Sequence, residues 1–450
     1  MKALIGGNLI DGAGRPVVND AAVLINGERI EAVGPRAAVT LPPATDVVDV
    51  SGMTLMPGLI DCHDHLRDLT PGLPTSEGLK LDDFLRAMWE SQRGMGVAEY
   101  RVAALLGSLQ RLKTGVTTVC DHCYTFHAEG LDDASLEGYQ SSGIRWVYAR
   151  GIMTRPYEPV CESWTEAETR IRDLVASGRV PAEAFFVAPV SIRQVGPEEF
   201  SKARSLADEL GCGVYTHVSE TPSELETWQA ECGTTPIKAL DGLGFLGPAT
   251  VLVHCVILDN EEIDILERRG CHVVHCPTNN MKLAKGVTRV PDLLKAGVNV
   301  AFGIDMMSDM FTEMRTEIGM QAIEQSDPNA VAKEEAVQMA TVRGARALGL
   351  GETLGTISVG HQADIALVDG RSLLQAVMMD PVHALVYATH PGMVRHVLVG
   401  GRHVIADGRS TLVDEEALLT EVESIASSFL DRAGIEHAPW FVKGGARRVG

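Results

Sequence analysis

The chain has 450 residues, of which 45% are hydrophobic, and it carries a formal net charge of −21 at pH 7. The acidic balance argues against a nucleic-acid or anionic-membrane partner, because both need a basic face. No apolar run approaches the roughly 20 residues of a membrane helix, and nine scattered cysteines indicate reduced thiols rather than a disulfide framework. We therefore expect a soluble, cytoplasmic protein without a membrane partner.

Residues 1–56 contain short strand-like runs separated by turn signals, including the Asn26-Gly27 step that is typical of a hairpin. The same β pattern returns after residue 360. We predict that residues 1–56 and 361–412 form one composite, discontinuous β-sandwich domain. Residues 413–450 are predicted to be a C-terminal helix and tail.

Residues 57–360 alternate strand-like and helix-like stretches eight times. The predicted strands span 59–63, 117–121, 144–149, 184–190, 213–217, 250–255, 272–276 and 298–304. Many are continuous apolar runs, as in parallel strands buried on both faces. Eight such units predict an α/β fold with a closed (β/α)₈ TIM barrel. Residues 66–97 are long for a barrel loop and are predicted to form a structured lid over the active face.

The first barrel strand ends in a His-x-His pattern. Side chains alternate along a strand, so His63 and His65 project to the same side while Cys62 and Asp64 project to the other. Two imidazoles on one face can reach a single cation, and neutral imidazole suits zinc or ferrous iron. Alone, this motif is a weak signal.

Further candidates lie where other predicted strands end. His217 ends the fifth strand, His254 lies near the end of the sixth, and Asp305 follows the eighth, with Glu220 three residues beyond His217. In (β/α)₈ enzymes, groups at these strand ends converge on one active site. Three imidazoles and a carboxylate favour zinc or iron over magnesium, which prefers oxygen ligands.

Seven short motifs follow one another in a fixed order along nearly the whole chain. They are residues 57–65 (PGLIDCHDH), 216–221 (THVSET), 253–256 (VHCV), 275–283 (HCPTNNMKL), 302–305 (FGID), 360–365 (GHQADI) and 399–402 (VGGR). With these motifs the sequence resembles the amidohydrolase superfamily, in the branch of triazine hydrolases and of cytosine, guanine and methylthioadenosine/S-adenosylhomocysteine deaminases. Each motif is weak alone, but the ordered set is specific.

The resemblance implies one divalent metal ion, zinc or alternatively Fe²⁺, carrying a hydroxide that attacks an electrophilic carbon. The implied metal ligands are His63, His65, His217 and Asp305. By the same resemblance, Glu220 moves the proton, His254 orients the hydroxide, and Asp305 accepts a proton from the water. A catalytic metal with an open position lowers the pKa of its bound water to about 7.

Two departures from the family pattern concern the pocket. Residues 185–193, around the fourth strand, lack the lysine that bridges two metals in related barrels, so we predict one metal. Met306 and its neighbours after Asp305 replace a common family pattern, so the pocket floor is expected to differ. The predicted substrate contacts are Trp89, His122, His127, Arg193, Gln194 and His275.

We predict a metal-dependent hydrolase that deaminates an amino-substituted nitrogen heterocycle: a purine, pterin, pyrimidine or s-triazine. Hydrolysis of an acyclic guanidine, amidine or amide, or of a ring carbon–halogen bond, remains open, because the sequence does not reveal the leaving group. A non-catalytic scaffold barrel is the alternative from another class. The resemblance also implies a homodimer or homotetramer.

Overall fold

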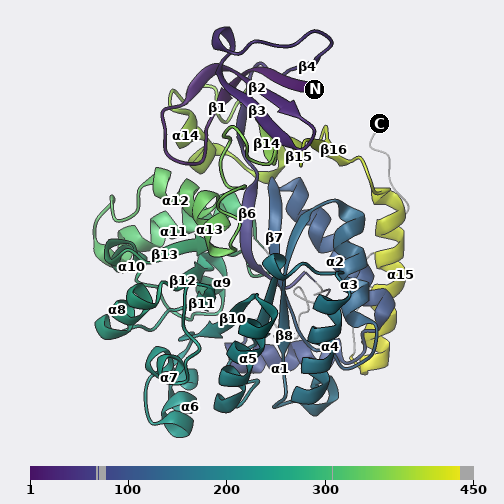
Figure 1. The fold of residues 1–450 in the computed structure, drawn as a ribbon, viewed down its shortest axis with the longest axis vertical. Coiled ribbons are helices and arrows are strands. Elements are labelled where there is room, and N and C mark those ends of the chain that lie inside the picture. Colours follow the sequence, from purple (N-terminus) through teal and green to yellow (C-terminus); the bar gives the residue numbers. More distant parts are fainter. Residues whose placement is uncertain (67–68, 70–77, 307, 436–450) are drawn as a thin grey trace.

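The computed structural model describes residues 1–66, 69, 78–306 and 308–435, and these form two β-sheets with surrounding helices (Figure 1). One sheet has eight parallel strands and the other is a mixed sheet of nine. In Figure 1 the mixed sheet lies at one end of the barrel, above the start of β6.

The eight parallel strands follow one another around the barrel in chain order. They are β6 (Leu59–Asp64), β7 (Val116–Cys123), β8 (Arg145–Ile152), β9 (Phe185–Pro189), β10 (Gly213–Val218), β11 (Thr250–His254), β12 (His272–His275) and β13 (Asn299–Phe302). The last strand returns to the first, because the backbone N–H of Asp305 donates to the carbonyl of His63 at 2.9 Å. The predicted (β/α)₈ fold is confirmed.

Helices surround the barrel, and several begin and end at residues that favour helix termini. The α-helices are α1 (Leu81–Gln92), α2 (Val97–Lys113), α3 (Leu131–Ser142), α4 (Trp164–Ala176), α5 (Pro197–Leu210), α6 (Pro222–Cys232), α7 (Pro236–Gly242), α8 (Asn260–Arg269), α9 (Pro277–Lys282), α10 (Val290–Ala296), α11 (Met310–Gln325), α12 (Lys333–Met339), α13 (Val342–Ala347), α14 (Pro381–His383) and α15 (Glu415–Ala433). Helix α5, for example, starts at Pro197 and stops at Gly211, whose φ of +70° is costly for other residues.

The barrel interior is filled by side chains that alternate inward along the strands. Ile60, Cys62, Val251 and Val253 belong to this inner cluster, which continues into α13 at the N-terminal end of the barrel. There a Cβ added at Gly344 would meet Ile60 at 3.1 Å, so α13 packs closely against β6. The far end of the barrel is thereby left for the functional site.

The mixed sheet combines strands from residues 2–57 with strands from residues 365–410. Its strands are β1 (Lys2–Leu9), β2 (Val18–Asn26), β3 (Arg29–Pro35), β4 (Asp46–Asp49), β5 (Met53–Pro57), β14 (Ile365–Asp369), β15 (Val394–Val399), β16 (Arg402–Ala406) and β17 (Arg409–Ser410). Strand β5 pairs antiparallel with β14, and β5 leads directly into β6. The sheet therefore anchors the first barrel strand.

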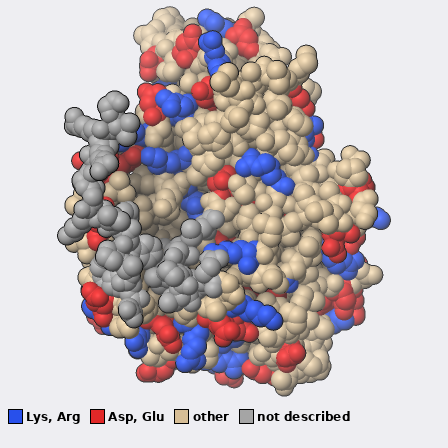
Figure 2. All heavy atoms as spheres, turned by 180° about the vertical axis from the view of Figure 1, so that it is seen from behind, with Lys and Arg blue, Asp and Glu red and all other residues tan. Residues whose placement is uncertain are grey.

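Helix α1 closes the other end of the barrel, within the segment predicted to form a lid. Leu81, Phe84, Leu85 and Met88 of α1 line the cavity at the strand ends. Residues 67–68 and 70–77 of the predicted lid, and 436–450 of the predicted tail, lie outside the described residues. Acidic and basic side chains are interspersed over the face in Figure 2. Across the described ranges, no helix is long and apolar enough to cross a membrane.

Candidate metal centre and active site

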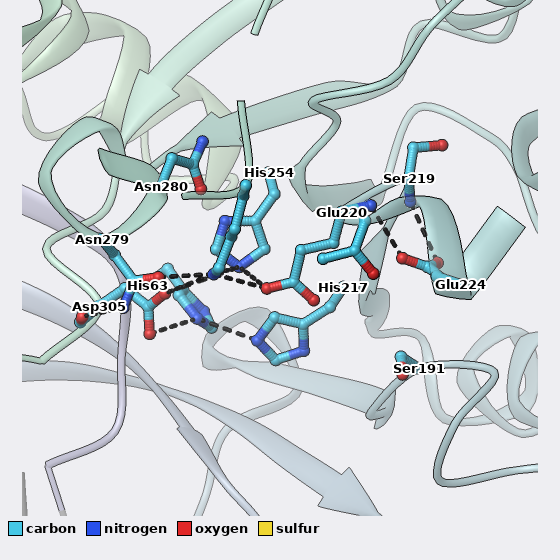
Figure 3. Close-up of polar contacts among 12 residues, drawn as sticks. His63, Ser191, His217, Ser219, Glu220, Glu224, His254, Asn279, Asn280 and Asp305 are labelled. Atoms are coloured by element: carbon cyan, nitrogen blue, oxygen red, sulfur yellow. Dashed lines mark hydrogen bonds and ion pairs between the residues drawn. The ribbon is translucent and has the colours of Figure 1, made fainter. Parts of the chain in front are cut away.

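Four side chains from three separate strand ends meet at one point in the barrel mouth. The Nε2 atoms of His63 and His217 are 3.1 Å apart. Oδ1 of Asp305 lies 3.4 Å from Nε2 of His63 and 3.5 Å from Nε2 of His65. Donor atoms about 2.1 Å from a tetrahedral zinc ion stand roughly 3.4 Å apart, so this set fits one cation. Figure 3 shows His63, His217 and Asp305 turned toward one another.

The hydrogen bonds behind the histidines leave their Nε2 atoms available as ligands. The Nδ1 atom of His63 contacts the Tyr215 hydroxyl at 2.8 Å, and that hydroxyl donates to a backbone carbonyl. The Nδ1 atoms of His65 and His217 lie 2.8 and 2.9 Å from the carbonyls of His122 and Val190. An Nδ1–H donated in this way fixes the ring and frees the Nε2 lone pair, as in metal-binding histidines.

The pKa values of the buried groups suit a cation. Burial, aided by His63, lowers the pKa of His217 to about 4, so its imidazole is neutral at pH 7. Burial alone would raise the pKa of Asp305, but His63, Lys285 and His254 hold it well below its usual range. A neutral imidazole and an ionised carboxylate are the protonation states that bind metal.

Glu220 and His254 lie beside the four convergent side chains. Nε2 of His254 is 3.2 Å from Oε1 of Glu220 and 3.6 Å from Oδ2 of Asp305. Burial opposes ionisation of Glu220, yet Lys285, His254 and Arg193 together lower its pKa below the ordinary value. The backbone N–H of Glu220 donates to Glu224 at 2.8 Å, which fixes the start of this segment (Figure 3).

A buried charge network joins the end of β6, which carries His63 and His65, to the loop after β13, which carries Asp305. Asp64, on the opposite face of β6 from His63, accepts from the N–H groups of His65 at 2.8 Å and Met306 at 3.2 Å. Arg111 of α2 bonds both Asp64 and the carbonyl of Met306. Asp305 and Met306 have φ values of +50° and +97°. Such left-handed backbone is costly without glycine, so this network stabilises it.

Replacing Arg111 by glutamine is expected to destabilise the protein and to weaken metal binding. Arg111, Asp61 and Asp64 are all buried, and removing one partner of a buried ion pair costs about 3–5 kcal/mol. Urea unfolding of the metal-free protein measures the first effect, and zinc content per chain measures the second.

Arg172→Gln is the matched control for this experiment, because Arg172 pairs with the exposed Glu209 at 2.7 Å. An exposed pair contributes about 0–1 kcal/mol. If both arginine variants lost the same small amount of stability, the Asp64–Arg111 network would have no special role in supporting the metal centre.

The cavity above these residues is lined by Arg193 and Gln194, two of the predicted substrate contacts. Both lie in the turn after β9. Nη1 of Arg193 is 3.1 Å from Oε2 of Glu220, and Gln194 accepts from the Ser191 hydroxyl. The side chains of α1 make the opposite wall apolar. The cavity encloses about 530 Å³, its open mouth included.

The other predicted contacts lie outside this cavity wall. His122 is buried, with its ring stacked 4.8 Å from that of His217. The ring nitrogens of His127 contact the carbonyls of Thr125 and Met95 at 3.0 and 3.1 Å. His275 turns toward Glu317 of α11, with Nε2 and Oε2 2.8 Å apart. The rings of these three histidines contact other protein groups rather than the cavity. The sequence alone does not reveal these contacts.

Trp89, the remaining predicted contact, is buried in an apolar cluster and stacks on Tyr157 with ring centroids 6.4 Å apart. It lines a neighbouring outer cavity, which shares Leu85 and Arg193 with the inner one. The structure therefore brings Trp89 near the entrance rather than to the metal centre.

Sequence reasoning missed Lys285 and Asn279, which both line the cavity. Lys285 follows α9, two residues beyond the end of the HCPTNNMKL motif, and its ammonium group donates to Oδ1 of Asn279 at 2.5 Å. A charged residue two positions after a family motif was a signal that it could belong to the site. The direction of the Lys285 side chain, however, depends on how the loop after α9 folds.

Comparison with known proteins agrees with this geometry. Residues 54–404 match the Amidohydrolase family. The chain belongs to the amidohydrolase family. It is 32% identical over 407 residues to a 5-methylthioadenosine/S-adenosylhomocysteine deaminase from Syntrophobacter fumaroxidans, covering 87% of this chain and 90% of the relative. It is 31% identical over 398 residues to a 5'-deoxyadenosine deaminase from Methanopyrus kandleri, covering 86% and 89%.

Solved structures resemble this chain over nearly its whole length. A Xanthomonas campestris adenosine deaminase with bound zinc has a TM-score of 0.87 and 28% identity, covering 96% of this chain and 98% of that one. Atrazine chlorohydrolase TrzN from Arthrobacter aurescens TC1, complexed with zinc, has a TM-score of 0.88 at 23% identity, covering 95% and 100%, and supports the fold alone. This amidohydrolase is an enzyme that hydrolyses carbon–nitrogen bonds, of the deaminase type, and that prediction is confirmed.

Proposed function

We propose that this amidohydrolase uses one zinc ion to remove an amino group hydrolytically from a carbon of a nitrogen heterocycle. The observation that carries the proposal is the convergence of His63, His65, His217 and Asp305, with Glu220 and His254 directly beside them. Fe²⁺ is the alternative metal, since the same ligands suit it.

The donor set indicates what a bound metal would contribute. Three imidazole nitrogens and one carboxylate oxygen leave a zinc ion room for one more ligand, and such an ion activates water at neutral pH. Strand β9 contains no lysine, and the carbonyl of Val190, one residue past the end of that strand, accepts from His217. This supports a single metal.

The residues of this chain then carry the protons. Glu220 takes one proton of the water as its oxygen bonds to the ring carbon, and delivers it to the ring nitrogen. The second proton, from the hydroxyl now on that carbon, passes to the departing amino group. The carbon–nitrogen bond then breaks and ammonia leaves. His254, 3.2 Å from Glu220 and 3.6 Å from Asp305, is placed to orient the attacking oxygen. Asp305 holds the metal and can accept a hydrogen bond from the water.

The test is ammonia release by the zinc-loaded protein from a panel of purines, pterins, pyrimidines, s-triazines and guanidino compounds. We expect turnover of at least one aminated ring. Release of chloride from a halogenated ring, or hydrolysis of acyclic guanidines alone, would contradict deamination of a heterocycle while leaving the metal centre in place.

We also propose a cytoplasmic homodimer or homotetramer. The exposed apolar side chains of Leu373, Val377 and Met379, at 95%, 85% and 98% exposure, support a subunit contact. Light scattering on the purified protein measures the subunit number, and a monomer at working concentration would contradict the proposal.

A further inference from the structure

The wall of the reaction cavity contains a buried ammonium group. Lys285 lies in the loop between α9 and α10, and its side chain is 1% exposed. Its Nζ atom is 2.6 Å from Oε1 of Glu220, 2.5 Å from Oδ1 of Asn279 and 3.9 Å from Oδ2 of Asp305. The lysine therefore lines the same cavity as Glu220 and Asp305.

Lys285 and Arg193 hold the two oxygens of Glu220 between them. Arg193 contacts Oε2 at 3.1 Å and has further carboxylate partners in Asp82, at 3.1 Å, and Glu224, at 3.6 Å. Lys285 is different, because its other acidic contact is Asp305, a proposed metal ligand. Among the described residues that line the cavity, Glu220 and Asp305 are the only carboxylates.

The charge balance of this arrangement changes during the proposed reaction, on which this inference rests. When Glu220 takes a proton it becomes neutral, and Asp305 is engaged with the cation. The ammonium of Lys285 then remains buried beside neutral Glu220, the amide oxygen of Asn279 and the uncharged ring of His254, whose Nε2 lies 3.5 Å away. A buried cation without a counter-charge is costly, so a bound substrate that supplies one is favoured.

We propose that the substrate is an aminated ring that carries an anionic oxygen, and that Lys285 binds this oxygen. A ring carboxylate and an ionised ring oxygen share this chemistry. The apolar side chains of Phe84, Met88 and Leu283 on the cavity wall suit the faces of a flat ring. An adenine base carries no oxygen and offers Lys285 no such partner, so Lys285 determines specificity against it.

Two matched pairs of compounds test the substrate class in the zinc-loaded protein. Ammelide and melamine are aminotriazines with and without ring oxygens, and pterin-6-carboxylate and pterin differ by a carboxylate. We expect kcat/KM to favour the more oxygen-rich member of at least one pair by tenfold or more, and the favoured pair identifies the source of the oxygen. Equal use of both members in each pair, or preference for melamine and pterin, would overturn the proposal.

Lys285→Gln should lower kcat/KM for the favoured compound by about 10- to 100-fold, the usual effect of losing a hydrogen bond to a charged group. For the oxygen-poorer member of the pair, kcat/KM should change less than about threefold. Lys285→Arg should restore the preference for the oxygen-rich member. Lys295→Gln, an exposed lysine on α10, is the control. An equal loss for both members of the pair would overturn the assignment of Lys285.

A binding measurement makes the test independent of turnover. In Glu220→Gln the neutral amide imitates protonated Glu220, so Lys285 loses the negative charge of this partner while Asn279 still accepts from it. By calorimetry, this zinc-loaded variant should bind ammelide or pterin-6-carboxylate at least tenfold more tightly than the wild type does, and Glu220→Gln/Lys285→Gln should lose that gain. Weaker or unchanged binding of both anions would overturn the proposal. If no ring releases ammonia while this pattern holds, the proposed deamination fails and the anion site stands.

Discussion

The variant His65→Ala is expected to contain no stoichiometric zinc and to release no measurable ammonia. His65 provides one of four donor atoms within about one cation's reach, with its Nε2 atom 3.5 Å from Oδ1 of Asp305. Its Nδ1 is already held by the carbonyl of His122, so Nε2 is the ring nitrogen that can face the ion. Removing one of four ligands lowers affinity for the ion, and the activated water is lost with it.

Zinc per chain, measured by mass spectrometry of the metal, and ammonia release are to be recorded on the same samples. His396→Ala is the matched control, since this histidine lies on β15 in the mixed sheet. It should keep both zinc and activity. A His65→Ala protein that retains one zinc ion per chain and normal turnover would remove His65 from the ligand set.

The second large effect is expected for Glu220→Gln, which should keep its zinc and lose turnover. Glutamine has nearly the same shape, but its amide cannot take the proton from water. Positioned acid–base catalysis typically contributes about 10²–10⁴ in rate, and kcat should fall by that factor. Glu220 is not one of the four donors that converge, so the metal content should stay near one per chain.

Glu226→Gln serves as the control here, because Glu226 is exposed on α6 and lies six residues from the proposed proton carrier. It should behave like the wild type in both measurements. A Glu220→Gln protein with an unchanged kcat would refute the role of Glu220 in proton transfer, whatever its metal content.

The pH dependence of the site supports the same division of roles. His217 and His254 both have lowered pKa values, caused first by burial, so both imidazoles are neutral where the enzyme would work. The pKa of Glu220 is lowered by Lys285, His254 and Arg193 against the effect of burial. Glu220 is thus ionised before substrate binds, which is the state that accepts a proton.

Sequence patterns were enough to predict the barrel and the convergence of the four proposed ligands, and the reason is geometric. The C-terminal ends of barrel strands meet at one face. His63, His65, His217 and Asp305 lie at such ends, so their convergence follows from the strand order. The pairing of β5 with β14 likewise follows from two β-rich segments that each lack a complete sheet. The predicted alternation of Cys62 against His63 is wrong, because the register of β6 with β7 shifts between Asp61 and Asp64: Cys62 belongs to the inner cluster around Tyr215, and His63 contacts the Tyr215 hydroxyl.

The directions of the other candidate side chains, within strands and in loops, were decided by tertiary structure. The rings of His122 and His275 turn inside the protein, because His217 and Glu317 lie beside them in the fold. Lys285 turns inward because its loop folds back over α9, which brings its amine to Glu220 and Asn279. The local sequence therefore determined which metal-binding types of side chain stand at the strand ends, while packing between distant segments decided which groups line the cavity.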